Sequence, residues 1–381
     1  MKKIFLLDLD TFFISVERIA DHSLIGKPVI VGGDPKAGRG VVAACSYEAR
    51  KYGLHSAMSI KNAFRLCPHG IYLHGNFDEY LRYSNLVKRF LSGLAPVLEQ
   101  ASIDEFYMDF TGTEHIYGST LFLANNIKKE IHKKFKLPCS IGISSNKTTA
   151  KILCDLSKPN GLIYVPGSSV KKFLSPLQVS RIPGVGKKTL VKLNSLGIHK
   201  IEDINKLPLE FFTAAFGKSG LDIWHKANGE GTEYLTVERE QKGMSKEVTF
   251  SKDVLSNKTI EDVLFKNTAK LCHKLREDNI TAGTITLKLR YSDFKTLTRS
   301  KTISEPTNQD YKVYESVLNL FRIAHTRRIA VRLVGIRLSN FKHFTDQSAL
   351  FDNRGESMKR LYNAVDKIRT KYEYKTIRFG R

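Results

Sequence analysis

The stretch Lys3-Ile-Phe-Leu-Leu-Asp-Leu-Asp10 decides the fold of this chain, because an apolar run there ends on two carboxylates. Uninterrupted apolar residues over so short a length predict a buried β-strand. Two further short apolar runs, Val29–Gly32 and Gly40–Cys45, predict strands separated by a glycine-rich turn. The opening of the chain therefore predicts a sheet with acidic side chains at the end of one strand.

A second acidic strand end is Ser102-Ile-Asp-Glu105, which leads into a predicted strand over Glu105–Phe110. Asp104 shares the alternating face of Phe106, where a carboxylate is costly unless it is paired or binds a metal. Carboxylates at neighbouring strand ends suit Mg²⁺, and two such ions activate a hydroxyl and neutralise a leaving pyrophosphate. Strand-end turn and cap chemistry explains each acidic pair taken alone. Adjacent residues of a strand also point opposite ways, so this second pair converges only if the backbone bends.

A basic group of residues accompanies these acids. Tyr47 and Arg50 are three residues apart and so neighbours on one face of a helix predicted over Ser46–Tyr52. Lys158-Pro-Asn-Gly161 places an ammonium just before a turn. Together these side chains can clamp a triphosphate, with Arg50 giving bidentate contacts and Lys158 a point charge. Taken singly, each is an ordinary solvated surface base.

The segment up to about Pro166 mixes strands with crossover helices and predicts an α+β catalytic core. Its remaining predicted helices are Ser59–Cys67, Asp78–Leu94, Leu121–Lys136 and about Lys147–Ser157, and its remaining strands are Leu98–Ile103 and Pro138–Ser144. Residues 167–230 then show short helical patches with almost no strand signal, and residues 231–243 read as a charged, extended linker.

From Met244 onward the predicted order is β-α-β-β-α-β, a small sandwich of two helices on one sheet. Its strands are predicted at Glu247–Val254, Thr284–Tyr291, Lys295–Ile303 and Ala330–Ser339, and its helices at Thr259–Glu277 and Asn308–Phe321. Within the second strand, apolar residues alternate with Thr286, Lys288 and Arg290. The strand therefore has one core face and one basic face, which suits a sheet lying on phosphates.

Charge identifies the partner. The 381 residues carry a net charge of +23, with +9 on residues 1–240 and +14 on residues 241–381. Such an excess predicts a polyanionic partner, most commonly nucleic acid, although a generally basic soluble protein is the alternative. Composition is otherwise ordinary for a globular protein, with 41% hydrophobic and 26% charged residues, which excludes global disorder.

Five cysteines without a CxxC pair argue against a disulfide framework or a zinc site. No run reaches the roughly 18 to 20 apolar residues of a membrane span, and the opening apolar run is too short for a signal peptide. We therefore expect a cytoplasmic protein with no membrane partner.

Several of these motifs stand in the order and spacing of Y-family DNA polymerases, and the chain most resembles the DinB branch of that family. The match runs from residue 1 to about residue 340. The motifs that carry it are Asp8-Leu-Asp-Thr-Phe-Phe13, Tyr47-Glu-Ala-Arg50, Ser102-Ile-Asp-Glu105, Gly142-Ile-Ser-Ser-Asn-Lys147 and Lys158-Pro-Asn-Gly161.

The resemblance implies a right-hand polymerase of α+β class. Its parts would be a catalytic palm at residues 1–18 and 79–166, fingers at 19–78, a helical thumb with a helix-hairpin-helix at 167–230, a linker at 231–241, a little finger that binds DNA at 242–341 and a C-terminal tail at 342–381.

The resemblance also assigns roles to residues. Asp8, Asp104 and Glu105 would be the catalytic carboxylates and would hold two Mg²⁺ ions, with the Leu9 carbonyl as a further ligand. Tyr47, Arg50 and Lys158 would bind the triphosphate of the incoming dNTP. Phe13 would lie under the sugar as a steric gate, although the Phe12-Phe13 pair on its own reads as core.

DNA contacts are expected in two places. Ile182-Pro-Gly-Val-Gly-Lys-Lys188, between helical patches at Leu177–Arg181 and Thr189–Leu196, resembles a helix-hairpin-helix. Its glycines would let backbone amides approach a phosphate, and a simple turn between helices is the alternative. The expected DNA-binding residues are Gly184, Gly186, Lys187 and Lys188 in this hairpin and Lys288 and Arg290 in the basic strand.

Gln347-Ser-Ala-Leu-Phe351 resembles the peptide by which bacterial polymerases bind the sliding clamp, with Gln347, Leu350 and Phe351 as the contacts. It departs from that pattern at Ser348, and ordinary helix packing is the alternative. The segment Leu361–Tyr374 reads as a basic amphipathic helix.

The sequence therefore predicts a monomeric, template-directed DNA polymerase of the translesion type, acting on primer–template DNA and dNTPs. Low processivity is expected, as is a lack of proofreading, because no exonuclease-like segment is evident. One rival is a catalytically inactive DNA-binding accessory protein with the same fold. Another is a nucleotidyl cyclase, which shares palm-like carboxylates but does not need the hairpin or the basic C-terminal sandwich.

Overall fold

The structure is a computed structural model that describes residues 2–237, 240–343, 354–372 and 377. The chain divides into two compact units, Met1–Arg239 and Glu240–Arg381. Each unit is described here by itself.

The first unit is built around a five-stranded sheet with the strand order β5-β6-β1-β7-β8. The central strand β1 runs antiparallel to both of its neighbours, β6 and β7. The strands are β1 (Ile4–Leu9), β5 (Val97–Gln100), β6 (Glu105–Asp109), β7 (Cys139–Ser144) and β8 (Leu162–Tyr164). The opening apolar run is therefore the middle strand, which explains why it is buried on both faces.

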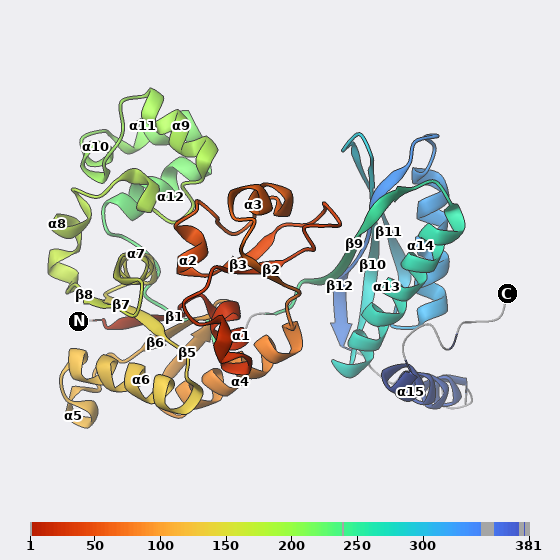
Figure 1. Cartoon of the computed structure of the whole chain (residues 1–381), viewed down its shortest axis with the longest axis horizontal. Helices are drawn as coiled ribbons and strands as arrows, with labels where there is room; N and C mark the ends of the chain where they lie inside the picture. Colours follow the sequence, from red (N-terminus) through yellow and green to blue (C-terminus); the bar gives the residue numbers. More distant parts are fainter. Residues whose placement is uncertain (1, 238–239, 344–353, 373–376, 378–381) are drawn as a thin grey trace. The chain divides into compact units, whose positions relative to one another are not determined.

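The two faces of this sheet are covered by different helices (Figure 1). Phe5 and Leu7 face a large core to which α1, α4 and α6 contribute, whereas Ile4 and Leu6 face Ala150 of α7. The bounds of these helices are α1 (Phe12–Ala20), α4 (Phe77–Ser92), α6 (Thr120–Phe135) and α7 (Lys147–Ser157). Alternation along one strand thus fixes a sheet between two helical layers.

A smaller three-stranded sheet and a helical region complete the first unit. The small sheet has the order β3-β2-β4 and carries two short helices; its elements are β2 (Val29–Gly32), β3 (Val42–Cys45), α2 (Tyr47–Arg50), α3 (Ile60–Leu66) and β4 (Ile71–Leu73). The helical region comprises α8 (Val170–Leu174), α9 (Lys187–Ser195), α10 (Ile201–Asn205), α11 (Leu209–Phe216) and α12 (Lys218–Ala227).

The segment that follows α12 is held against the first unit by a buried carboxylate. Glu99 is 1% exposed, and both of its oxygens accept hydrogen bonds from Lys147 Nζ, at 2.7 and 2.6 Å. The backbone N–H of Thr236 donates to the same carboxylate at 2.8 Å. The first part of the predicted linker is therefore anchored to the sheet.

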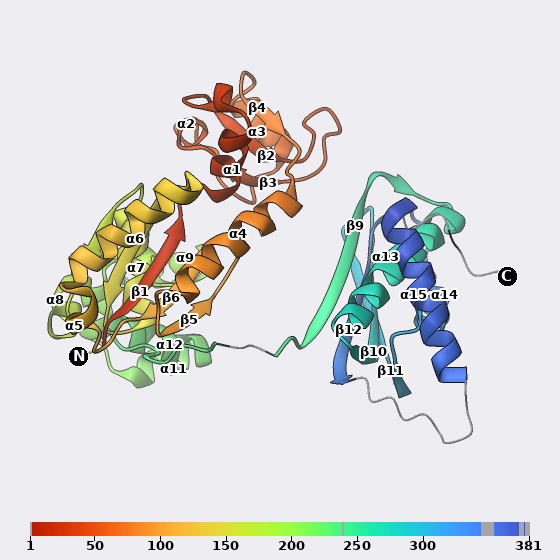
Figure 2. The ribbon, with the colours of Figure 1, turned by 90° about the horizontal axis from the view of Figure 1, so that it is seen from below.

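The second unit has the predicted β-α-β-β-α-β order, with the sheet order β11-β10-β12-β9. Two helices cover one face of this sheet (Figure 2). The elements are β9 (Gly243–Val254), α13 (Asn257–Glu277), β10 (Ile280–Tyr291), β11 (Thr296–Thr307), α14 (Asp310–Ala324) and β12 (Val331–His343).

A final helix, α15 (Arg354–Tyr372), packs on the second unit through buried charges. Arg276 of α13 makes two hydrogen bonds of 2.7 Å to Asp366 of α15 and one of 2.7 Å to Asp310 of α14. Arg369 of α15 also donates to Asp310, and neither of these side chains is exposed. The predicted C-terminal helix is confirmed, begins earlier than Leu361, and belongs to the fold of this unit.

Local predictions failed where elements are very short. The strands β4 and β8 and the single-turn α5 (Glu114–Tyr117) carry too few residues for a periodic signal. The predicted helix at Leu177–Arg181 is only a 3₁₀ turn over Val179–Arg181.

All five cysteines are free and buried. Within the described residues, no helix is long and apolar enough to span a membrane.

Candidate active site

Three carboxylates lie at one end of the large sheet, because antiparallel pairing brings the end of β1 to the start of β6. Asp8 stands directly opposite Glu105 in the strand register. The Leu9 N–H donates to the Asp104 carbonyl at 3.0 Å. The sequence predicted that Asp104 shares the alternating face of Phe106, and this is wrong, because residues 102–104 form bends and Asp104 precedes β6. Its carboxylate accepts a hydrogen bond from Ser102 Oγ at 2.6 Å.

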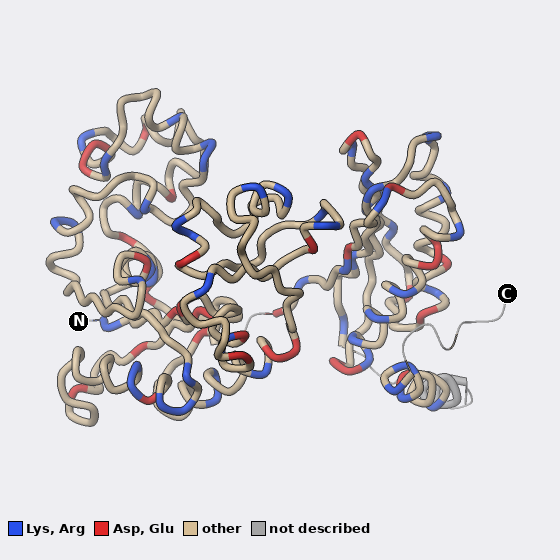
Figure 3. The backbone as a smooth tube through the Cα atoms, viewed as in Figure 1, with Lys and Arg blue, Asp and Glu red and all other residues tan. Residues whose placement is uncertain are grey.

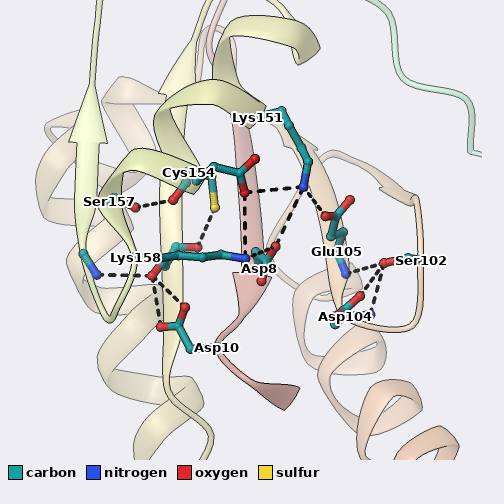
Figure 4. A network of polar contacts seen from close by, with 12 residues as sticks. Asp8, Asp10, Ser102, Asp104, Glu105, Lys151, Cys154, Ser157 and Lys158 are labelled. Atoms are coloured by element: carbon teal, nitrogen blue, oxygen red, sulfur yellow. Dashed lines mark hydrogen bonds and ion pairs between the residues drawn. The ribbon is translucent and has the colours of Figure 1, made fainter. Parts of the chain in front are cut away.

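Two lysines reach these carboxylates from α7 and the residue after it (Figure 4). Lys158 Nζ lies 2.6 Å from Asp8 Oδ2, and Lys151 Nζ lies 4.0 Å from the same oxygen. Lys151 also donates to Glu105 and lies 3.6 Å from Asp155. The ammonium groups therefore stand among the carboxylates, where they neutralise part of the negative charge.

This neutralisation is incomplete at Asp8. Burial of its side chain raises the pKa of Asp8 to about 7. The Lys158 ammonium opposes this rise, whereas the negative charges of Asp104 and Glu105 add to it. Burial disfavours the charged form of Lys158, but the nearby Asp8 carboxylate outweighs it and raises the pKa of Lys158. The site retains an excess of negative charge that a further cation would relieve.

The donor set fits a hard divalent cation. Asp8, Asp104 and Glu105 supply carboxylate oxygens at one sheet end, which is the ligand type that Mg²⁺ prefers. Their side chains are turned toward Lys158, Ser102 and Lys151 respectively. Accordingly, among the described residues, no three acidic, histidine or cysteine side chains are already gathered to hold a metal. In this structure the ammonium groups of Lys158 and Lys151 provide the positive charge beside Asp8 and Glu105.

The second acid of the opening motif serves another purpose. Asp10 is 1% exposed and accepts hydrogen bonds from Ser140 Oγ at 3.0 Å and from the Asn160 N–H at 2.7 Å. The structure thus separates Asp8, which faces the lysines, from Asp10, which faces the Lys158–Gly161 turn.

Tyr47 and Arg50 are neighbours on α2, as their spacing predicted. The Arg50 guanidinium lies 5.1 Å from the centre of the Tyr47 ring. Burial, and next the charge of Asp10, raises the pKa of Tyr47. A 2.9 Å ion pair between Arg18 of α1 and Glu48 fixes the short helix in place.

Phe13 and Phe12 have different environments. Phe12 is 3% exposed and belongs to the core, whereas Phe13 is half-buried and stacks on Tyr80, with the ring centres 4.2 Å apart and the planes at 10°. A ring held in this way cannot easily turn aside, which is the rigidity that a steric gate needs.

The hairpin at 182–188 has the geometry that its glycines predicted. Gly184 has a φ of +99°, and Gly186 precedes the first turn of α9, where Lys187 and Lys188 are exposed. Lys226 of α12 donates to the Pro183 carbonyl at 2.9 Å. The backbone amides at the start of α9 are therefore available to a phosphate.

The basic face of β10 is also as predicted. Ile285, Leu287, Leu289 and Tyr291 are fully buried, and the residues between them point to the other face. There Lys288 Nζ pairs with Glu247 at 2.9 Å and Arg290 Nε donates to Thr296 at 2.8 Å. Lys and Arg recur along this unit (Figure 3). The clamp-like residues Gln347, Leu350 and Phe351 lie outside the described residues.

Sequence reasoning missed Lys151 and Asp155. The signal was present, because Lys151, Asp155 and Lys158 follow one another at the i, i+4, i+7 spacing of a single helical face. This spacing shows that the three charged residues share a face, but not what that face contacts. The pairing of β1 with β7 is needed to place it beside the acidic sheet end.

Comparison with known families agrees with this arrangement. Residues 7–155 match the impB/mucB/samB family, residues 241–350 match the C-terminal domain of that family, and residues 167–198 match its HHH motif. The last match includes α8, so the helix before the hairpin lies earlier than Leu177.

Similar relatives span the whole chain. A DNA polymerase IV of Dehalococcoides mccartyi (strain CBDB1) is 36% identical over 382 residues, covering 100% of this chain and 97% of that protein. A DNA polymerase IV of Listeria innocua is 37% identical over 341 residues, covering 90% and 96% of the two chains.

Solved structures give the same result. A Y-family DNA polymerase chimera, Dbh-Dpo4(243-245)-Dbh, matches with a TM-score of 0.79 at 30% identity, over 90% of this chain and 99% of that one. DinB from Sulfolobus solfataricus matches with a TM-score of 0.60 at 30% identity, over 88% and 98%.

The fold and its acidic sheet end are thus those of a nucleotidyl-transferring polymerase. The chain belongs to the Y family of DNA polymerases, within which the similar relatives carry the name DNA polymerase IV. The predicted fold class and the predicted enzyme class, a DNA-directed DNA polymerase of the translesion type, are confirmed. These comparisons give no support to the inactive accessory protein.

Proposed function

We propose that this polymerase adds deoxynucleotides to a primer 3′-hydroxyl and releases pyrophosphate, using two Mg²⁺ ions held by Asp8, Asp104, Glu105 and the Leu9 carbonyl. The supporting observation is the charge balance at the sheet end. Asp8 is buried opposite Glu105, and its pKa is raised to about 7 by burial and by the neighbouring acids, even though Lys158 is 2.6 Å away. Family members are metal-dependent nucleotidyltransferases, and this site has the charge to attract the metal.

The residues around the carboxylates have distinct parts in this proposal. When the nucleotide binds, the Lys158 ammonium leaves Asp8 and pairs with an oxygen of the triphosphate. The phosphate oxygen is an anionic partner that replaces the carboxylate. Tyr47 donates its hydroxyl to the same triphosphate, and Arg50 adds a bidentate contact. Lys151 stays between Glu105 and Asp155.

When bound, Mg²⁺ would make the primer hydroxyl a better nucleophile and neutralise the leaving pyrophosphate. The protein supplies the rest of the selectivity. The Phe13 ring, stacked on Tyr80, lies beneath the deoxyribose and leaves no room for a 2′-hydroxyl. The hairpin amides beside Gly184 and the basic face of β10 hold the DNA backbone without reading its sequence.

Primer extension on a defined primer–template, with Mg²⁺ and one dNTP at a time, tests this assignment. Asp104→Ala is expected to lower nucleotide addition at least about a thousandfold, which corresponds to about 4 kcal/mol, and to leave DNA affinity within a few fold. Asp109→Ala is the matched control, because this carboxylate lies at the opposite end of β6, where it pairs with Lys2. Near-normal extension by Asp104→Ala would disprove the metal-site assignment.

We also propose that Gln347, Leu350 and Phe351 bind the bacterial sliding clamp. The support is the sequence of this segment alone. Replacing Leu350 and Phe351 by Ala is expected to remove stimulation by the clamp and to leave synthesis on short templates unchanged. Stimulation that survives the double replacement would assign the segment to ordinary packing.

A further inference from the structure

Asp10 is buried beside the proposed catalytic carboxylates but takes no part in their ion pairs. Its side chain is 1% exposed, and Ser140, at the start of β7, is fully buried. Ser140 Oγ lies 3.0 Å from each carboxylate oxygen of Asp10, and the Asn160 N–H donates to Asp10 Oδ2 at 2.7 Å. The carboxylate therefore ties the end of β1 to a turn that follows α7.

The same turn is also fixed at Gly161 and Asn160, the residues that follow Lys158-Pro159. The Gly161 N–H donates to Ser140 Oγ at 3.3 Å, and Lys128 Nζ of α6 donates to the Gly161 carbonyl at 2.9 Å and to the Asn160 carbonyl. A side chain at Gly161 would meet the Ser157 carbonyl at 1.8 Å, so only glycine fits. Asn160 has a φ of +50°, a conformation that needs support from its neighbours.

We propose that Asp10 is a positioning residue for the incoming nucleotide, because it fixes the turn from which Lys158 meets the triphosphate. The inference rests on the proposed role of Lys158. The Lys158 ammonium lies 2.6 Å from Asp8, within the space that the triphosphate and metals would enter, so a small displacement of the turn moves this charge away from the phosphates. Asp10 itself touches neither the nucleotide nor the primer.

The charged carboxylate suits this part better than a neutral group. It accepts from two donors at once, the Ser140 hydroxyl and the Asn160 amide, and charged acceptors hold such donors more tightly than neutral ones. Asp10→Asn keeps an oxygen for Asn160, and the Ser140 hydroxyl can turn to accept from the new amide. Asp10→Ala leaves both donors without an acceptor in a buried site.

A double-mutant cycle in the full-length protein tests the proposal. The readout is equilibrium affinity for the correct dNTP, measured on a complex with a dideoxy-terminated primer so that no chemistry occurs. Loss of a charge-assisted contact predicts that Asp10→Ala weakens dNTP affinity about 10- to 100-fold, with DNA affinity changed less than about twofold. Asp10→Asn and Ser140→Ala are expected to give smaller losses in the same direction.

The decisive comparison is with Lys158→Ala. If Asp10 acts through Lys158, the double variant Asp10→Ala/Lys158→Ala binds the nucleotide no more weakly than Lys158→Ala alone. Losses that multiply, or equal losses of DNA and nucleotide affinity, would mean that Asp10 has only a structural part, and the inference would fail while the proposed function stands. Unchanged dNTP affinity in Lys158→Ala would instead overturn the proposed triphosphate site, and the inference with it.

Discussion

Two buried networks of charge, one in each unit, differ in a way that separates function from architecture. At the sheet end of the first unit, burial of Asp8 is relieved only in part by Lys158, and the pKa of Asp8 is raised to about 7. In the second unit, burial of Asp366 is outweighed by Arg276, which holds the pKa of that carboxyl below its ordinary value.

The cause lies in the partners. In the first network, two ammonium groups are shared among several carboxylates. Lys151 Nζ lies 4.0 Å from Asp8 and 3.6 Å from Asp155, which are long distances for ion pairs. In the second network, Arg276 makes paired 2.7 Å hydrogen bonds to Asp366, and Asp310 receives both Arg276 and Arg369. A network with unmet negative charge can take up a cation, whereas a satisfied one can only hold helices together.

The largest expected effect is on activity. Asp8→Asn removes a proposed metal ligand and is expected to lower nucleotide addition at least about a thousandfold. The same change removes a carboxylate whose burial is poorly compensated, so the thermal midpoint of the first unit should not fall. Fluorescence of Trp224, which lies in that unit, reports its unfolding. A variant that is active, or that unfolds much more easily, would contradict the contrast drawn here.

The opposite pattern is expected for the second network. Arg369→Met leaves Asp310 buried with Arg276 as its one remaining ion-pair partner among the described residues, and breaking such a pair typically costs about 3 to 5 kcal/mol. The unfolding transition seen by circular dichroism should move to lower temperature, while the Trp224 transition stays in place. Lys274→Met is a control, because that side chain is 54% exposed and its ion pairs contribute little. If the unfolding temperature falls equally in both variants, the buried Arg369–Asp310 pair stabilises the unit no more than an exposed ion pair does.

Much of this contrast was predictable from the sequence, and the missing part has a physical reason. Asp8 and Glu105 follow from strand ends and spacing, which are local. The sequence shows Asp10 only as the second carboxylate at the end of the same apolar run as Asp8. However, β1 ends at Leu9, and Asp10 is the first residue of a turn. The exact end of a strand depends on tertiary contacts that a pattern does not contain.

The second network was invisible for a stronger reason. Local periodicity identifies α15 as an amphipathic helix, but arginine is a residue expected on the surface. Arg369 is buried where Asp310, on a helix distant in sequence, offers it a buried carboxylate. Pairing of that kind requires the packing of α13, α14 and α15 to be known first.

The pH dependence of stability offers a smaller effect that is specific to Asp8. Its folded pKa is raised above the unfolded value, so between about pH 4 and pH 7 the folded state holds a proton that the unfolded state has released. Stability from this group is therefore present at low pH and lost as the pH rises toward 7. Without metal, Asp8→Asn should gain about 1 to 3 kcal/mol relative to the unmodified protein between pH 5 and pH 7.5. A difference independent of pH would contradict the raised pKa.

The smallest expected effect comes from removing a buried pair whole. Asp310→Leu with Arg369→Met deletes both charges, and replacement of a buried ion pair by apolar groups of similar volume is often close to neutral. Arg276 keeps its two hydrogen bonds to Asp366 and one of 2.6 Å to the Asn308 carbonyl, so it does not become an unpaired buried charge. The double variant should therefore lose only about 1 to 2 kcal/mol, less than Arg369→Met alone. Denaturant unfolding of the two variants measures the difference. If the double variant is the less stable, the Arg369–Asp310 pair contributes packing that Met and Leu cannot replace, and the second network is more than a set of balanced charges.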